Sequence, residues 1–577
     1  MFLWTTQREL IPNGSVSTGC PPVAFVMIHL FKHINQLKSR RGIVHILAGL
    51  VAVACANGQA QQVERVAEFE QWPGVSQMIS YRDRIWLVNS EPFTDTNSAD
   101  VYSYSIDDDS LRYERSLFTQ DVGAPVIYNG LLHWPFEDPR RSAGSGEYAV
   151  TDGVHWQWRT MQSGSVMHVH AMNVCDGDLV AATGSWTGQL HRLGDNNEWQ
   201  VEYDYPAAEN RFSRIVSVAQ LGDDCLLGAA AKGKDEAKLL SLQGDEPEPA
   251  GGWPSSERVD YLTRHQQALY AFSDAKGARQ LIRYDGEQSR VILLPDNHRP
   301  RAMHSDGDNL WLVAHNRNDN DKTGSLWQYT DNHEFKLVQY FEEVPISLAS
   351  LNGAIAIGTY AKSGAALLLY KQVASVSAKS SSELSQDPLL PVEAESAELD
   401  SELVDSLYKD LLDIISDPEN TASYARILRR NLGRHPELKT PEFGAALMRV
   451  LSVPIEGEPT TMFTGQSISR QDLIHWFLIT TLAINGHGRI DPVWINSGPD
   501  LIVPDSKKVF DPSIASIVAS GWLQQDDKPL LKELFIRLNN TSDPLWVKSD
   551  IIGALTAITE QRFGYDVSAW NLWWSRQ

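Results

Sequence analysis

The sequence predicts a β-propeller followed by an α-helical array, and three observations lead to this prediction. A strand–turn–strand pattern recurs between residues 79 and 359, and its equivalent positions run from Ile85 to Ile355 in six intervals that average 45 residues. From Leu403 onward, apolar residues instead recur at helical spacing. Residues 373–402, rich in serine and acidic side chains, separate the two regions and are typical of a flexible linker.

Each repeat contains two hairpins. The first joins two apolar stretches through a turn rich in Asp, Asn and Gly, which is the turn chemistry of β-hairpins. Its copies are ISYRDRIWLV (79–88), VIYNGLLHWP (126–135), MNVCDGDLVAATG (172–184), VAQLGDDCLLGA (218–229), YLTRHQQALYAF (261–272), MHSDGDNLWLVA (303–314) and LASLNGAIAIGT (348–359). A second hairpin lies out of phase, as in YSYSIDDDSLRYERS (102–116), and gives four short strands per unit. A period of about 40–45 residues with four strands is typical of propeller blades, so residues 61–372 are expected to form seven four-stranded blades.

The last repeat is one strand short. It ends at AALLLYK (365–371) after three strands, whereas VERVAEF (63–69) is an apolar strand that precedes the first unit. We expect residues 63–69 to complete the last blade and close the ring, because closure removes the exposed edges of the sheet.

The propeller repeats resemble those of secreted bacterial propellers of the kelch and BNR (Asp-box) kind. The segments Asp195–Trp199 and Asp152–Trp156 keep the outline of the Asp-box pattern, whereas the double glycines of kelch repeats are missing. The resemblance covers the repeat region and implies its architecture, without implying a sialidase-like activity.

Residues 403–577 are expected to form an α-helical domain. In VDSLYKDLLDIIS (404–416) the residues Leu407, Leu411, Leu412 and Ile415 lie on one helical face, and further helical segments follow with short polar joins. The closing segment IIGALTAITEQRFGYDVSAWNLWWSRQ (551–577) resembles the end of secreted bacterial HEAT-type helical repeats. Asp566 is expected to cap the last helix, and its tryptophans to share one face that seals the end of the array.

The N-terminal residues 1–60 are typical of a secretory signal peptide. Lys38, Arg40 and Arg41 precede an apolar run that is too short to span a membrane, and small residues precede a cleavage site between Ala60 and Gln61. Because residues 1–26 fit no signal region, Met27 is an alternative start.

The compartment expected from this segment is the periplasm or the exterior. Ala52–Cys55 loosely resembles a bacterial lipobox, so a lipoprotein anchored through Cys55 is the alternative. No transmembrane helix is expected in the mature chain.

The chain has 577 residues, of which 73 are acidic and 50 are Lys or Arg, for a formal net charge of −23. This balance argues against nucleic acid as a partner, because nucleic-acid binding needs clustered positive charge. The acidity is explained by solubility and does not indicate a substrate.

Three histidines and two cysteines are the candidate site residues. His168 and His170 alternate on one predicted inner strand, and His304 lies on another, so the three are candidates for a metal site near the propeller axis. Histidines that hydrogen-bond within the channel are the alternative, and no other cofactor is expected. Cys175 and Cys225 remain after signal cleavage, and export permits a disulfide between them, with two buried thiols as the alternative.

These features predict an exported, non-catalytic interaction or ligand-binding protein. A protein or glycan ligand would bind on the propeller face, and a second protein would dock on the helical domain, because both repeat folds offer large concave surfaces. The alternatives are a glycan-active enzyme with dispersed site residues at the propeller axis, and the metal-binding propeller described above.

Overall fold

The computed structural model divides the chain into two compact units, Met1–Gln61 and Gln62–Gln577. The described residues all lie in the second unit. They are 63–92, 98–139, 146–161, 166, 168–184, 187–205, 213–231, 237–242, 247–254, 256–275, 278–294, 298–316, 323–330, 334–371, 399–416, 440–454, 460–461, 467–469, 474, 478, 481–482, 528–541, 543 and 545–577. The predicted signal peptide with Cys55 and Ala60, and residues 373–398 of the predicted linker, lie outside them.

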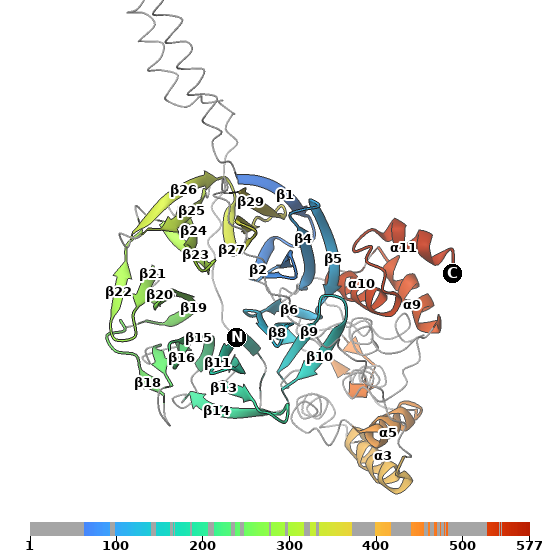
Figure 1. The fold of residues 1–577 in the computed structure, drawn as a ribbon. Coiled ribbons are helices and arrows are strands. Elements are labelled where there is room, and N and C mark those ends of the chain that lie inside the picture. Colours follow the sequence, from blue (N-terminus) through green and yellow to red (C-terminus); the bar gives the residue numbers. More distant parts are fainter. Residues whose placement is uncertain are drawn as a thin grey trace, which may run out of the picture. The chain divides into compact units, whose positions relative to one another are not determined.

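The strands form curled antiparallel sheets arranged around an axis, as in a β-propeller (Figure 1). Each blade is named here by its innermost strand. The β2 blade comprises β2 (Gly74–Tyr81), β3 (Arg84–Ser90), β4 (Asp100–Ser105) and β5 (Ser110–Ser116). The next blade has a split inner strand, β6 (Thr119–Val122) and β7 (Val126–Tyr128), followed by β8 (Leu131–Pro139), β9 (Glu147–Thr151) and β10 (Trp156–Thr160).

The chain continues around the axis with the same order of strands. The β11 blade comprises β11 (His168–Cys175), β12 (Asp178–Gly184), β13 (Gly188–Leu193) and β14 (Trp199–Tyr205). The β15 blade comprises β15 (Ser213–Leu221), β16 (Asp224–Ala231), β17 (Leu239–Ser241) and β18 (Glu248–Pro249). The β19 blade comprises β19 (Arg258–His265), β20 (Ala268–Ala275), β21 (Ala278–Tyr284) and β22 (Ser289–Ile292). The β23 blade comprises β23 (His298–Ser305), β24 (Leu310–Asn316), β25 (Gly324–Tyr329) and β26 (Phe335–Phe341).

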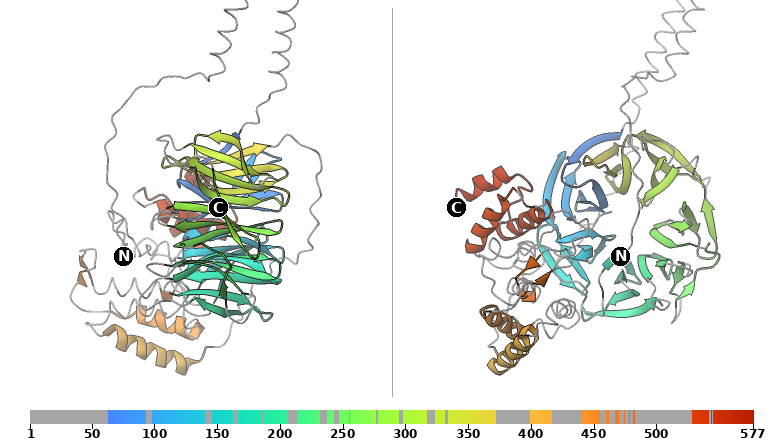
Figure 2. Two further views of the ribbon diagram at one scale, coloured as in Figure 1. Left: turned by 90° about the vertical axis from the view of Figure 1, so that its left-hand side faces the viewer. Right: turned by 180° about the vertical axis from the view of Figure 1, so that it is seen from behind.

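The first strand of the described chain pairs with the last one of the propeller. In the β27 blade, β27 (Val344–Leu351), β28 (Ala354–Tyr360) and β29 (Ala365–Lys371) are consecutive, and β1 (Val63–Phe69) pairs antiparallel with β29. The pairing is the one expected for residues 63–69. Figure 2 shows the sheets from the side and from behind, with β1 on the outer edge of this blade.

Turn chemistry explains several inner hairpins. Asp176 has φ +55° and Gly177 has φ +89°, and the pair Asn352 and Gly353 also has positive φ at both positions. Two consecutive positive φ values are required by the tight turn that matches strand twist, and Asn, Asp and Gly tolerate them best. The core lies between neighbouring blades, where Trp86 of one blade and Trp134 of the next belong to one buried cluster.

The structure joins Cys175 and Cys225 in a disulfide, with their Cα atoms 5.7 Å apart. Cys175 ends β11 and Cys225 lies at the start of β16, so the bond links neighbouring blades near the same end of the propeller. No helix among the described residues is long and apolar enough to cross a membrane.

From residue 399 onward the described chain is helical, with α3 (Ser401–Ser416), α5 (Pro441–Leu451), α9 (Lys528–Leu538), α10 (Leu545–Thr559) and α11 (Val567–Trp574), besides the short pair β30 (Thr460–Thr461) and β31 (Ser467–Ile468). Asp566 caps α11 by accepting a hydrogen bond from the Ala569 N–H at 2.9 Å, as predicted. Trp570 is fully buried and packs against Phe535 of α9, whereas Trp573 and Trp574 are partly buried beside it.

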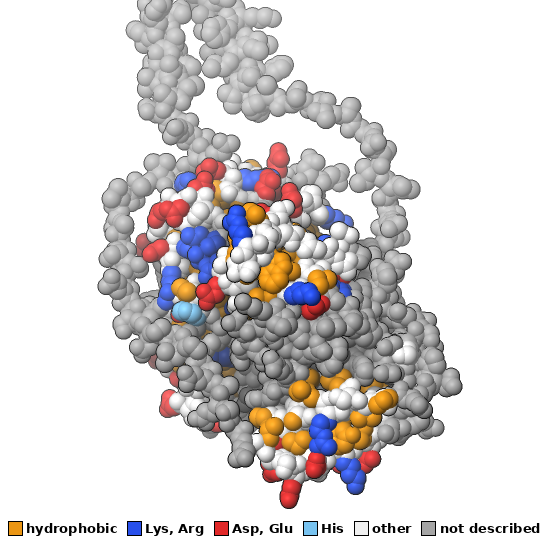
Figure 3. Space-filling view, turned by 90° about the vertical axis from the view of Figure 1, so that its right-hand side faces the viewer, with side chains coloured by type: hydrophobic (Ala, Val, Ile, Leu, Met, Phe, Trp, Pro, Cys, Tyr) orange, Lys and Arg blue, Asp and Glu red, His pale blue; other side chains and the backbone are white. Residues whose placement is uncertain are grey.

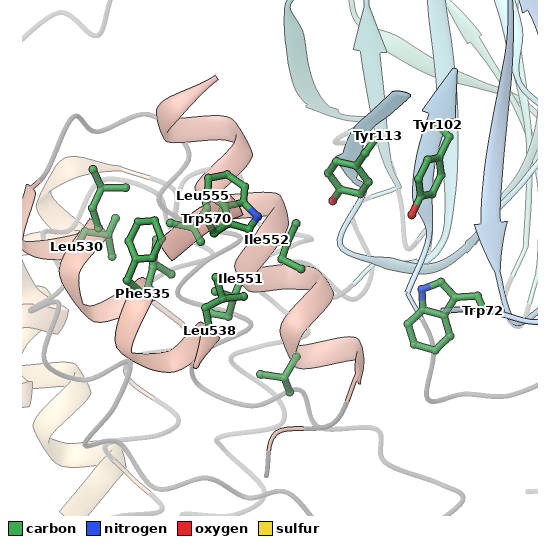
Figure 4. Close-up of a cluster of buried hydrophobic side chains, with 14 of the residues drawn as sticks. Trp72, Tyr102, Tyr113, Leu530, Phe535, Leu538, Ile551, Ile552, Leu555 and Trp570 are labelled. Atoms are coloured by element: carbon green, nitrogen blue, oxygen red, sulfur yellow. The ribbon is translucent and has the colours of Figure 1, made fainter. Parts of the chain in front are cut away.

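Helix α10 packs against the outer strand β5 of the β2 blade. Figure 4 shows the aromatic side chains of the blade and the apolar side chains of α9 to α11 in one buried cluster. Gly553 makes this approach possible, because a Cβ atom there would lie 2.7 Å from Cβ of Ser116. Buried Asp100 of β4 accepts hydrogen bonds from Ser549 at 2.7 Å and from Tyr565. The last helices and the propeller therefore share a core and a buried polar contact.

Candidate functional site at one end of the propeller axis

Every inner strand carries one extra residue near its start. The pairing of inner and second strands shifts by one residue between Val75 and Gln77 in β2, and the same shift occurs in β11, β15, β19, β23, β27 and at the break between β6 and β7. Such bulges bend a strand and redirect side chains, and they are frequent next to binding sites. The residues at the shifts include Ser76, His170, Val216, Tyr261, Arg301 and Ile346.

Two carboxyl groups face each other beside these bulges. Asp121 of β6 pairs in register with Glu137 of β8, which places their side chains on the same face. Asp121 accepts hydrogen bonds of 2.9 Å from the hydroxyls of Ser76 and Ser90. Burial, and secondarily the charge of Glu137, raises the pKa of Asp121 to about 7. One carboxyl of this pair is therefore half-protonated near neutral pH.

His168 and His170 stack with ring centroids 5.5 Å apart. Nδ1 of His168 lies 2.9 Å from Oδ1 of Asp138, and Nδ1 of His170 lies 3.6 Å from Oε1 of Glu137. Burial lowers the pKa of His170 well below its ordinary value, and the charges of His168 and Arg214 act in the same direction. His170 is therefore neutral at physiological pH.

Arginines approach from the following blades. Arg214 of β15 lies 3.7 Å from Glu137 and 3.4 Å from Nε2 of His168. On the β19 blade, Arg258 donates to Asp260 at 2.7 Å and Arg279 lies 3.1 Å from the same carboxylate. Burial lowers the pKa of Arg214, and the carboxylates of Glu137 and Asp138 oppose this shift.

Tyr261, at the bulge of β19, has a strained backbone conformation. Its φ is +54°, a value that bulky residues rarely adopt, and its side chain is 36% exposed. The ring lies 5.4 Å from that of Phe272, and the guanidinium of Arg279 lies 5.9 Å from its centroid. Strain of this kind costs about 1–3 kcal/mol and concentrates at functional sites.

The three histidines predicted as a group are not brought together. His168 is the first residue of β11, whereas His304 is the last but one of β23 and lies 2.8 Å from the Ser350 hydroxyl. Among the described residues, no group of three His, Cys, Asp or Glu side chains is placed to hold a metal ion. Metal binding by His168, His170 and His304 stays an untested prediction.

The other residues of this cluster were not identified from the sequence. Each of Asp121, Arg214, Arg258 and Tyr261 lies near the start of an inner strand. An alignment of the repeats could have identified them. The starts of the inner strands all lie at one end of the axis, so residues at these aligned positions are expected to lie close together. The bulges that redirect them share no common sequence marker, although Gly123 and Pro125 lie at the break between β6 and β7.

No protein-family model matches this chain, and no curated protein matches it in sequence. The solved structures that are similar to it include the β-propeller domain of the Trilobed protease from Pyrococcus furiosus, with 9% identity, a TM-score of 0.38, and coverage of 51% of this chain and 94% of that domain. The WD40 propeller domain of Doa1 is 12% identical, with a TM-score of 0.35, and covers 53% of this chain and 97% of its own. An acylaminoacyl peptidase is 9% identical, with a TM-score of 0.37 and 52% of both chains covered.

Proposed function

We propose that this chain is an exported, non-catalytic binding protein, built from a seven-bladed propeller with kelch- or BNR-like repeats and a HEAT-like helical domain. The propeller binds a ligand at the end of the axis where the bulges lie, and the helical domain docks a second protein. Export rests on the predicted signal peptide, and a lipid anchor on Cys55 is its alternative.

The observation that carries this proposal is the accessibility of the charged cluster. The side chain of Arg258 is 46% exposed and that of Glu137 is 34% exposed, although both lie near the propeller axis. Together with Tyr261 they form an accessible polar surface with an aromatic ring beside it, which is the composition of a ligand site.

A thermal-shift screen with soluble compounds of different classes tests the proposal. We expect at least one class to raise the melting temperature of the full chain without being consumed, and Arg258→Ala to abolish that rise. A ligand that stabilises the original protein and Arg258→Ala equally would bind elsewhere and would contradict the proposed site.

One observation favours a second candidate, a glycan hydrolase. Hydrolases of this kind use two carboxyl groups, one of them protonated near neutral pH, and Asp121 and Glu137 match this pattern. Release of reducing ends from polysaccharides, lost in both Asp121→Asn and Glu137→Gln, would establish it. Turnover that persists in both variants would exclude this pair from the reaction.

A further inference from the structure

We propose that the end of the axis around Tyr261 binds an uncharged saccharide, with one sugar ring stacked on Tyr261 and its hydroxyls bonded to Arg258 and Glu137. This inference rests on the proposed function, because it names the class of ligand for the same site.

Tyr261 has the features of a stacking platform. Phe272 and the Arg279 guanidinium support its ring, and Arg279 is itself held by Asp274 at 2.9 Å and by Asp260 at 3.1 Å. A supported ring loses little conformational freedom on binding, and an aromatic face covers apolar C–H groups such as those of a sugar ring. The remaining exposed face of the ring is thus available to a ligand.

The polar groups around this platform suit hydroxyls. Arg258 and Arg214 present N–H donors, whereas Glu137 and Asp138 present carboxylate acceptors. A hydroxyl both donates and accepts a hydrogen bond, so one polyhydroxylated ring can satisfy both kinds of group. Hydrogen bonds to charged groups are stronger than those between neutral groups, which favours this pairing.

The charges argue for a neutral ligand. Two guanidinium groups, Arg214 and Arg258, are interspersed with two carboxylates, Glu137 and Asp138, so charges of both signs face a ligand. An anionic ligand would meet the carboxylates and a cationic ligand would meet the arginines, and either would lose affinity through repulsion.

His170 provides an independent indication of a ligand. Its side chain is 6% exposed, and Nε2 has no hydrogen-bond partner in the part of the chain that the structure describes. Because Nδ1 faces Glu137 and the ring is neutral, Nε2 is an acceptor. A buried acceptor without a partner is costly, and a ligand hydroxyl would supply the missing donor.

Isothermal titration of the full chain tests the inference. The probes are cello-, malto-, laminari-, xylo- and manno-oligosaccharides as neutral sugars, oligogalacturonate as an anionic sugar and chitosan oligomers as a cationic one. We expect a neutral sugar to bind best. Tyr261→Ala and Arg258→Gln should each weaken its binding at least about tenfold, and Tyr340→Ala, which truncates an exposed tyrosine on β26, should change it less than about twofold.

The titration has outcomes that would overturn the saccharide proposal. Tyr261→Gly, which fits the left-handed backbone, replaces Tyr261→Ala if the latter is not folded by circular dichroism. No binding by any neutral sugar, or binding that both variants leave unchanged, would overturn it. A charged sugar or another ligand lost in the variants would overturn the saccharide assignment while leaving the proposed function intact.

Discussion

Tyr565→Phe tests the contact between the last helices and the propeller. The change removes one hydroxyl, which donates to the buried carboxylate of Asp100, while Trp72 and Ser549 donate to the same group at 2.9 and 2.7 Å. A hydrogen bond to a charged group contributes about 1.5–3 kcal/mol. We therefore expect the helices to open more easily by about 2 kcal/mol, which is a factor of about 30 in the opening equilibrium.

Hydrogen–deuterium exchange of α10 and α11 measures this opening directly. We expect amide exchange in these helices to accelerate about 30-fold, with little change in β19 or β23 of the far blades. Tyr340→Phe removes a hydroxyl from an exposed position and is the matched control. Acceleration below about threefold would refute the idea that Asp100 holds the helices on the blade.

Three further outcomes are expected. Loss of the disulfide in the double variant Cys175→Ser/Cys225→Ser should lower the free energy of unfolding in denaturant by up to about 4 kcal/mol, because the bond closes a loop with a sequence separation of 50. If reduction of the original protein leaves its denaturation midpoint unchanged, this expectation is contradicted. Because the pKa of Asp121 is raised to about 7 from an unfolded value near 3.9, the folded state holds the extra proton between these values. The free energy of unfolding should therefore fall as pH rises from about 4 to about 7, and it should fall less in Asp121→Asn. Urea titrations at several pH values measure this, and an equal change with pH in both proteins would contradict the expectation. The intact mass of the exported protein should match a chain that begins at Gln61. A mass that matches a chain beginning at a lipid-modified Cys55 would establish the alternative route.

The propeller was predictable because its signal is repeated and local. Asp-Gly and Asn-Gly turns recur at an even period, and the positive φ values of Asp176 and Gly177 follow from that turn chemistry. The pairing of β1 with β29 was predictable because the last repeat lacked a strand. The cap at Asp566 was also predictable, because an aspartate side chain readily accepts hydrogen bonds from the unpaired N–H groups at the start of a helix.

The candidate site was less predictable because it depends on the bulges. A bulge changes which residue faces the axis, and the bulge of β19 contains no glycine or proline, so Tyr261 looks like an ordinary strand residue in the sequence. His304 lies near the end of β23 whereas His168 begins β11, and position within the strand decides which end of the axis a side chain reaches. The contact between Asp100 and Tyr565 joins residues more than 400 positions apart, and no local pattern indicates it.

Charged side chains of both signs lie on the surface that Figure 3 presents. Figure 3 shows acidic and basic side chains interspersed on the side that it presents, with no face of a single sign among the residues coloured there. The grouping of arginines near the axis is therefore a local feature of the inner strands, and it does not follow from the composition of a chain with a net charge of −23.

Tyr261→Gly is the most direct test that the end of the axis is a binding site. Glycine relieves the backbone strain at φ +54° while the tyrosine ring is lost, so the free energy of unfolding should stay within about 1 kcal/mol of the original protein. Ligand affinity measured on the same sample should fall at least about tenfold. Unchanged affinity, accompanied by the loss of about 3 kcal/mol that removal of a core aromatic residue causes, would show that Tyr261 only supports the fold.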